Sequence, residues 1–158
     1  MCMLCYIVWS ENYDSGISIL DEQQRSLVSI INTYFFHKAE TGIDTNMCLL
    51  PITNMFKYQV KIHFMTLEQM LLQSEYDNME GFYAHQYEVF GSIKREERAC
   101  RIHEDADGLL EFLKKYWLGH AQRTSHLYAR HLMPLYGPDP WYSLQPAPPG
   151  GKSLQATS

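Results

Sequence analysis

The sequence lacks the signatures of several common functional classes. Its net charge is -5, its acidic and basic residues are interspersed, and no basic stripe runs along its 158 residues. Nucleic-acid-binding proteins gather lysine and arginine on one face, so a nucleic-acid partner is disfavoured. A polybasic segment that would bind anionic membranes is also missing. The composition argues mildly against these partner classes and leaves a folded globular protein as the expectation.

Long hydrophobic runs are missing as well. The apolar stretch from Met1 to Trp9 is short, has no basic region before it and runs directly into Ser10, Glu11 and Asn12. A signal peptide needs a basic start, and a membrane-spanning helix needs about 20 apolar residues. We therefore interpret this stretch as an ordered arm and expect no membrane association.

Cysteine and the common catalytic motifs are scarce. The chain has four cysteines, of which Cys2 and Cys5 form a C-x-x-C pair without a following histidine or a second pair. This pattern matches neither a c-type haem attachment site nor a zinc site, and it suggests free thiols in the cytoplasm. We find no nucleophile with a convincing partner, no glycine-rich phosphate loop and no paired inward carboxylates. The expectation is a non-enzymatic binding protein.

Four segments with helical periodicity are present, and they predict an all-α fold. The first runs from about residue 22 to 37, with Asp21 as its N-cap, and the second has Pro51 in its first turn. Glycine and acidic residues mark the breaks before the third and fourth segments. Their apolar stripes are, in order, Leu27, Val28, Ile31 and Phe35; Phe56, Val60, His63, Leu67, Met70 and Leu71; Phe82, Val89, Phe90 and Ile93; and Leu109, Leu113, Tyr116, Trp117, His120, Leu127 and His131.

The composition changes near the C-terminus. Residues 134–158 contain six of the seven prolines and three glycines. Proline interrupts helices, so we expect a partly disordered tail in residues 134–158 and no packed helix there. Residues 1–133 then form one domain, a four-helix bundle with an N-terminal arm. The charged run from Lys94 to Arg98 is expected to be a solvated helix face.

The order of these signals resembles that of the bacterial hemerythrins. Trp9 and Gly16, followed by Ile19-Leu20-Asp21-Glu22-Gln23, are similar to that family's opening. His63-Phe64, with Glu68 and Met70-Leu71, resembles its H-F-x-x-E-E-x-x-M motif. The stretch from Leu109 to His120 resembles L-L-x-F-L-x-x-W-L-x-x-H. The resemblance covers about residues 7 to 130 and implies an antiparallel up-down-up-down four-helix bundle.

The same resemblance implies a di-iron centre held by five histidines and two bridging carboxylates, and most of these ligands are missing. Carried over residue by residue, the family's ligands fall on Gln24, His63, Leu67, His120 and Ser125. On the third helix they fall on Phe82 and Gln86 in one register and on Tyr83 and Tyr87 in the other. His85 is near but lies at the edge of the apolar arc. A di-iron centre that binds dioxygen is therefore not expected.

His63 and His120 remain, and both lie on the apolar stripes of their helices. In an up-down bundle these two helices are diagonal, so the imidazoles should face each other. Two facing histidines can hold a haem iron axially. Our leading hypothesis is haem b bound by His63 and His120 for electron transfer or redox and gas sensing, with a redox partner protein. The cavity would be lined by Leu67, Phe82 or Tyr83, Met70 and Trp117.

Three alternatives stay open from the sequence. The two histidines could be leftovers hydrogen-bonded to Tyr83, Tyr87 or Gln24 in a metal-free interaction or signalling module. They could hold a single non-haem iron or zinc ion if Glu68 or Tyr87 turned inward, and residual iron and oxygen binding would further require His85 as a ligand. A second haem would use His131. His103 and His126 are expected to be solvated.

Overall fold

The computed structural model describes residues 7–41 and 49–137. Four long helices make up most of this part: α1 (Ser18–Thr41), α2 (Leu49–Gln73), α3 (Met79–His103) and α4 (Ala106–Arg123). A short 3-10 helix, η1 (Glu11–Tyr13), precedes them. After α4 the chain continues through a π-helical turn, η3 (Thr124–Tyr128), into α5 (Ala129–Tyr136). No strand occurs among the described residues, so the predicted all-α bundle is confirmed at that level.

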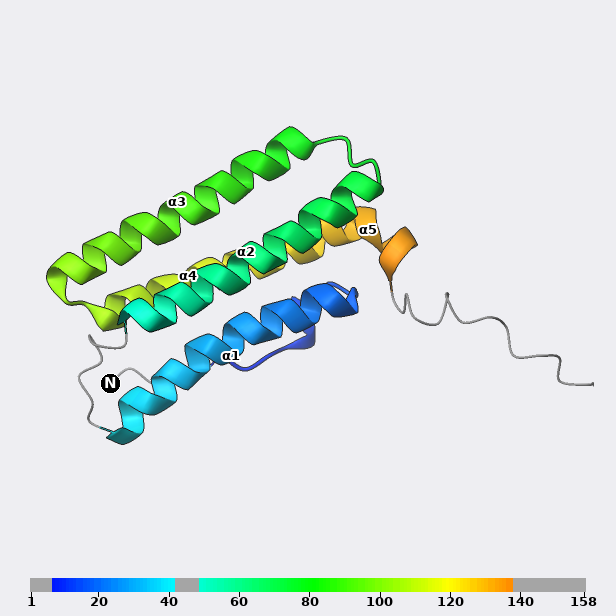
Figure 1. Cartoon of the computed structure of the whole chain (residues 1–158). Coiled ribbons are helices and arrows are strands. Elements are labelled where there is room, and N and C mark those ends of the chain that lie inside the picture. Colours follow the sequence, from blue (N-terminus) through cyan, green and yellow to red (C-terminus); the bar gives the residue numbers. More distant parts are fainter. Residues whose placement is uncertain (1–6, 42–48, 138–158) are drawn as a thin grey trace, which may run out of the picture.

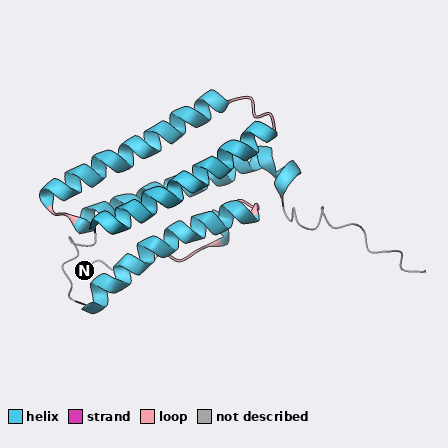
Figure 2. Cartoon of the chain, viewed as in Figure 1, coloured by secondary structure: helices cyan, strands magenta, loops and turns pink. Residues whose placement is uncertain are grey.

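The four long helices lie alongside one another, as Figures 1 and 2 show. Each packs against the next in sequence, and α1 also packs against α4, which closes the ring of neighbours. Chain reversals at residues 74–78 and 104–105 connect α2 to α3 and α3 to α4. Asn78 and Asp105 cap the helices that follow by accepting hydrogen bonds from Gly81 N and Gly108 N. In the described ranges, no helix is long and apolar enough to span a bilayer.

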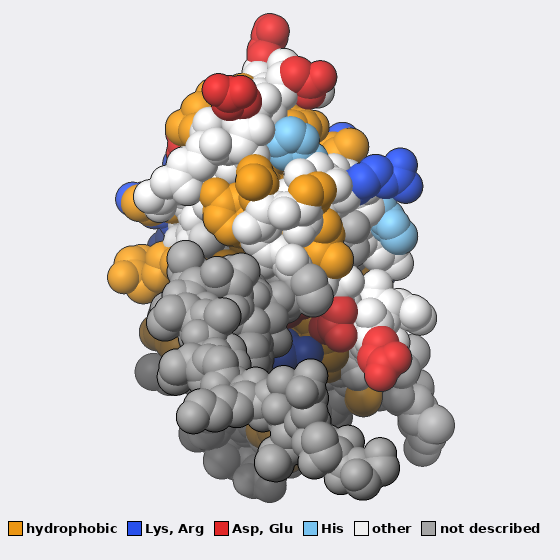
Figure 3. All heavy atoms as spheres, turned by 90° about the vertical axis from the view of Figure 1, so that its right-hand side faces the viewer, with side chains coloured by type: hydrophobic (Ala, Val, Ile, Leu, Met, Phe, Trp, Pro, Cys, Tyr) orange, Lys and Arg blue, Asp and Glu red, His pale blue; other side chains and the backbone are white. Residues whose placement is uncertain are grey.

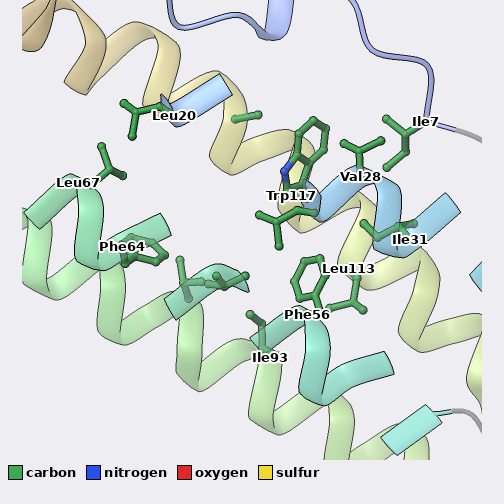
Figure 4. Close-up of a cluster of buried hydrophobic side chains, with 14 of the residues drawn as sticks. Ile7, Leu20, Val28, Ile31, Phe56, Phe64, Leu67, Ile93, Leu113 and Trp117 are labelled. Carbon is green, nitrogen blue, oxygen red and sulfur yellow. The ribbon is translucent and has the colours of Figure 1, made fainter. Parts of the chain in front are cut away.

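The core is a continuous apolar cluster with contributions from every long helix (Figure 4). Its largest fully buried side chains are Phe56, Phe64, Phe82, Trp117 and Tyr128. The arm joins the core through aromatic rings, because Trp9 and Tyr13 contact Trp117 with ring centroids 5.7 and 5.6 Å away. Aromatic pairs at such separations add to the stabilisation from buried area.

Two hydrogen-bonded contacts hold the arm against α1. Ile7 N donates to Asn32 Oδ1 at 2.9 Å, and Asn32 Nδ2 donates back to Ile7 O at 3.0 Å. Asp21 does not cap α1 as expected, because the helix begins at Ser18. Its buried carboxylate instead accepts from Ser15 N and Ser15 Oγ, both at 2.7 Å. A carboxylate in the first turn also complements the positive end of the helix dipole.

The expectation that residues after 133 form no packed helix is wrong. A packed helix does include Pro134, and it continues to Tyr136, whose hydroxyl donates to Gln73 Oε1 at 2.9 Å. Proline removes only one hydrogen bond this close to the helix end, and Met133 O still accepts from Gly137 N. Residues 138–158, the rest of the predicted tail, lie outside the described part.

The last helical stripe also differs from the predicted one. Tyr128 and Leu132 are buried, whereas Leu127 is exposed and His131 is half-buried. The π-helical turn η3 explains the change, because it winds more residues into one turn and so moves the inward face along the sequence. Glu97, expected to be solvated, is buried and paired with Lys57 at 2.9 Å.

Two neighbouring leucines on α2 provide a test of this core. Leu71 is 0% exposed, whereas Leu72 is 53% exposed. Leu71→Ala should lower the free energy of unfolding by about 2–5 kcal/mol, because it leaves a cavity in the core. Leu72→Ala should change it by less than about 0.5 kcal/mol. Urea unfolding followed by circular dichroism measures both, and equal losses would contradict the packing of α2.

Candidate functional site

Three histidines from three helices meet in the bundle interior. His63 on α2, His85 on α3 and His120 on α4 are all buried. The rings of His63 and His120 lie 5.1 Å apart and nearly perpendicular, so the predicted meeting of these two rings is observed. The rings of His85 and His120 lie 5.4 Å apart and nearly parallel. Phe64 covers the cluster, with its ring centroid 5.0 Å from that of His120.

His85 is the member that the sequence comparison with hemerythrins misses. Both registers considered for the third helix placed other residues inside, either Phe82 and Gln86 or Tyr83 and Tyr87. In the structure the buried face of α3 carries Phe82, His85, Val89 and Ile93. These residues are spaced by three, four and four, which is one continuous helical stripe. The periodicity of α3 itself was therefore the signal that could have placed His85 in the core.

A chain of hydrogen bonds runs from the surface through two of the histidines. Arg123 NH1 lies 2.9 Å from His85 Nδ1, and a guanidinium can only donate. His85 therefore carries its proton on Nε2 and donates it to His120 Nδ1, 3.2 Å away. His120 then carries its proton on Nε2 and donates it to Thr124 Oγ1, also 3.2 Å away. These partners define the tautomers of both rings.

His63 has a separate set of partners. Its Nδ1 lies 3.1 Å from Gln23 Oε1, which can only accept, so Nδ1 carries the proton. Gln23 is held in turn, because its Nε2 donates to Thr66 Oγ1 at 2.8 Å and Thr66 donates to Ile62 O at 3.0 Å. The other ring nitrogen, His63 Nε2, is buried and finds no hydrogen-bond partner among the described residues.

All three imidazoles are held in the neutral form. Burial lowers the pKa of His63 from 6.5 to about 4. The pKa of His120 is well below 6.5, mainly because the ring is buried. Repulsion from the Arg123 guanidinium, and from His63 and His85 if they became protonated, lowers it further. Burial and the Arg123 guanidinium lower the pKa of His85. The cluster therefore presents neutral nitrogens at physiological pH, which is the form that binds metal ions.

The other predicted site residues divide into two groups. Leu67, Gln24 and Trp117 are buried, and Figure 4 shows Leu67 and Trp117 among the core side chains. The amide of Gln24 and the indole N–H of Trp117 have no hydrogen-bond partner among the described residues. By contrast, Tyr83 is exposed and its hydroxyl donates to Glu68 Oε1 at 2.8 Å. Tyr87 is 84% exposed, so neither tyrosine lines the histidine cluster.

The remaining histidines and cysteines lie away from the cluster or outside the described side chains. His103 and His126 are exposed, as expected. Figure 3, which views the molecule from the right-hand side of Figure 1, also shows histidine atoms at the surface of that face. His131 packs against Tyr76 and its Nε2 lies 2.9 Å from Ser74 Oγ. Cys100 is buried, and burial together with Glu96 raises the pKa of its thiol to about 11. The side chains of Cys2, Cys5, His37, Cys48 and Ser125 are outside the described part.

Comparisons with known proteins identify no relative: no family model, curated protein or solved structure matches the chain. The fold and the cluster define a helical bundle with a buried histidine site, and its chemistry rests on the residues themselves. In the arrangement described, no three His, Cys, Asp or Glu side chains converge so that they could hold a metal ion directly. The nitrogens of His85 and His120 instead face each other through a hydrogen bond.

The lowered histidine pKa values predict that acid destabilises the fold. Between pH 6.5 and about 4 the unfolded chain protonates His63 while the folded chain keeps it neutral. The free energy of unfolding therefore falls as the pH falls through this window, and His63 alone contributes a loss of about 3 kcal/mol. His85 and His120 act in the same direction.

Urea unfolding at a series of pH values, with EDTA present, measures this dependence. His63→Gln removes the titrating group and should reduce the slope by up to about 1.4 kcal/mol per pH unit. His103→Gln is the matched control, because His103 is exposed and its replacement should leave the slope unchanged. An unchanged slope in His63→Gln would contradict a buried, neutral His63.

Proposed function

We propose that the bundle binds one divalent first-row transition-metal ion at His63, His85 and His120, with iron and zinc as the leading candidates. Neutral imidazole suits both ions. The unpartnered His63 Nε2, a buried lone pair within a cluster of three imidazoles, is the observation that carries the proposal. The site would hold a single ion where the resemblance to hemerythrins implies two. The role proposed is binding rather than catalysis.

Hydrogen bonds already orient two of the rings as metal ligands. Metal-binding histidines usually donate their second ring N–H to an oxygen, which fixes the tautomer and the ring orientation. His63 Nδ1 donates in this way to Gln23 Oε1, and His120 Nε2 donates to Thr124 Oγ1. The other two nitrogens are His63 Nε2, which has no partner among the described residues, and His120 Nδ1, which accepts from His85 Nε2. These are the two histidines that the sequence assigned as metal ligands.

The unpartnered lone pair gives the site an energetic reason to bind an ion. A buried polar atom without a hydrogen bond costs about 1–3 kcal/mol. His63 Nε2 carries such a cost, and so does the amide of Gln24, which is 0% exposed. A metal ion at His63 Nε2 would replace the missing interaction. Gln24 stands where the resemblance places a ligand of the first helix, so its amide oxygen is a further candidate ligand.

His85 would complete the ligand set after a change of tautomer. Its Nε2–H occupies the lone pair of His120 Nδ1, so an ion can bind His120 only when this hydrogen bond opens. If Arg123 left His85 Nδ1, the proton could move to Nδ1 and free Nε2 as a third ligand. Arg123 is exposed, so its side chain can move into solvent without leaving a buried charge. The metal-free hydrogen bond thus keeps the ligands neutral and close together.

Haem does not fit the histidines in this arrangement. A porphyrin would have to lie between the two axial imidazoles, and the rings of His63 and His120 are in contact at 5.1 Å. Glu68 and Tyr87, considered earlier as extra ligands, lie away from the cluster. The three-histidine site is therefore better supported than bis-histidine haem.

Cobalt titration and elemental analysis test the proposal. Protein expressed with added iron and zinc should contain about one ion per chain, because three imidazoles form one site. The protein stripped with EDTA should bind one equivalent of Co²⁺, develop visible absorption bands and melt at a higher temperature. His63→Ala and His120→Ala should abolish these changes. His126→Ala is the matched control, because this histidine is on the same chain segment but exposed.

Two other results of these measurements would each indicate a different function. A Soret band after haem addition that disappears in His63→Ala would overturn the metal proposal in favour of haem. A protein that stays free of metal, and whose melting temperature ignores EDTA, Co²⁺ and Zn²⁺, would instead be the metal-free interaction module. Circular dichroism of each variant confirms that it is folded, so a loss of binding is not a loss of structure.

A further inference from the structure

A second candidate site lies at the end of the bundle, away from the cluster of His63, His85 and His120. The start of α2 and the last turns of α3 enclose an open pocket of about 850 Å³. Four cationic side chains line it: Lys57 from α2, and Lys94, Arg98 and Arg101 from α3. It is an open depression at the surface, wide enough for a small organic molecule to lie against it. This concentration of positive charge stands out in a chain whose net charge is -5.

Among the described residues that line the pocket, the one acidic side chain is already paired. Glu97 is buried, and its Oε2 lies 2.9 Å from Lys57 Nζ. The remaining cations, Lys94, Arg98 and Arg101, have no side-chain partner in the part of the chain that the structure describes. The described side chains that line the pocket therefore carry a net positive charge of about three.

The spacing of these cations predicts the shape of the ligand. Positions 94, 98 and 101 follow one helix face and extend about 10 Å along its axis. A single small anion could pair with only part of such a row. Arg101 is in the last turn of α3, where it complements the helix dipole, but Lys94 and Arg98 lie further from the end and gain little from it. An extended anion with several negative charges could pair with all three cations at once.

We propose that this pocket binds a small organic anion that carries two or more phosphate groups. The guanidinium groups of Arg98 and Arg101 can each form two parallel hydrogen bonds to phosphate oxygens. The beginning of α2, which supplies Leu50 and Asn54, brings the positive end of a helix dipole to the same place. Leu50 and Ile102, both exposed to solvent here, offer an apolar contact for the organic part of the ligand.

Isothermal titration calorimetry with ATP as the probe tests this inference, with adenosine as the uncharged comparison. ATP should bind, adenosine should not, and ATP binding should weaken as salt is added. The double variant Arg98→Gln/Arg101→Gln should bind ATP at least about tenfold more weakly, because each charged hydrogen bond contributes more than a neutral one. Arg95→Gln is the matched control: Arg95 is on the same helix, but it bonds to Ser92 and does not line the pocket.

Three results would overturn it. Adenosine could bind as tightly as ATP, Arg95→Gln could weaken ATP binding as much as the double variant, or a glutamate-rich peptide could bind where ATP does not. The last result would identify a protein partner instead. His63→Ala, which removes the proposed metal ligand, should leave ATP binding unchanged, so the two sites fail or succeed separately.

Discussion

Burying three imidazoles in one apolar interior is the constraint on which much of this structure depends. A charged imidazole there would be costly, so each ring must be neutral, and each polar nitrogen needs a partner. These hydrogen-bond partners are polar side chains on the helices that surround the cluster. Arg123 and Thr124 follow directly after His120 on α4, and Gln23 is on the facing side of α1. One nitrogen, His63 Nε2, is left over, and this exception makes the cluster a candidate site and not only a polar core.

The π-helical turn η3 lies next to the residues that bond to the buried imidazoles. It begins at Thr124, whose hydroxyl accepts a hydrogen bond from His120, and it directly follows Arg123, which donates to His85. Such turns cost helical hydrogen-bond geometry and are found most often near functional sites. Here the wide turn also shifts the inward face, so that Tyr128 and Leu132 enter the core. The α5 helix then packs near Gly16, whose positive φ of 83° places it where glycine is favoured.

Helical periodicity alone predicted much of the fold. Almost all the predicted stripe residues of the first three helices are buried, because a helix that packs on one side must repeat apolar residues every three or four positions. The predictions failed where local chemistry adds to that rule. Asp21 is inside its helix, Pro134 is within α5, and the last stripe moves at the π-helical turn. The spacing of apolar residues does not predict these three features, because they depend on hydrogen bonds between particular side chains and the backbone.

The candidate site was harder to predict for a different reason. The resemblance to hemerythrins identified His63 and His120, but a register carried over from another family placed Tyr83 or Tyr87 where this chain has His85. The stripe of α3 itself, Phe82 to Ile93, would have placed that histidine in the core. The tautomers were beyond any sequence pattern, because they follow from Arg123, Thr124 and Gln23 reaching particular nitrogens.

The two proposed sites lie far apart along α3. Glu97, at the cationic pocket, is twelve residues after His85 on the same helix, which is about 18 Å along the axis. That separation exceeds the screening length of about 8 Å at physiological salt. The histidine cluster is neutral, and the Glu97–Lys57 pair removes the nearest buried charge at the pocket. The most direct route by which an ion bound at one end could influence an anion at the other is the packing of α2 against α3, the two helices that contribute to both sites.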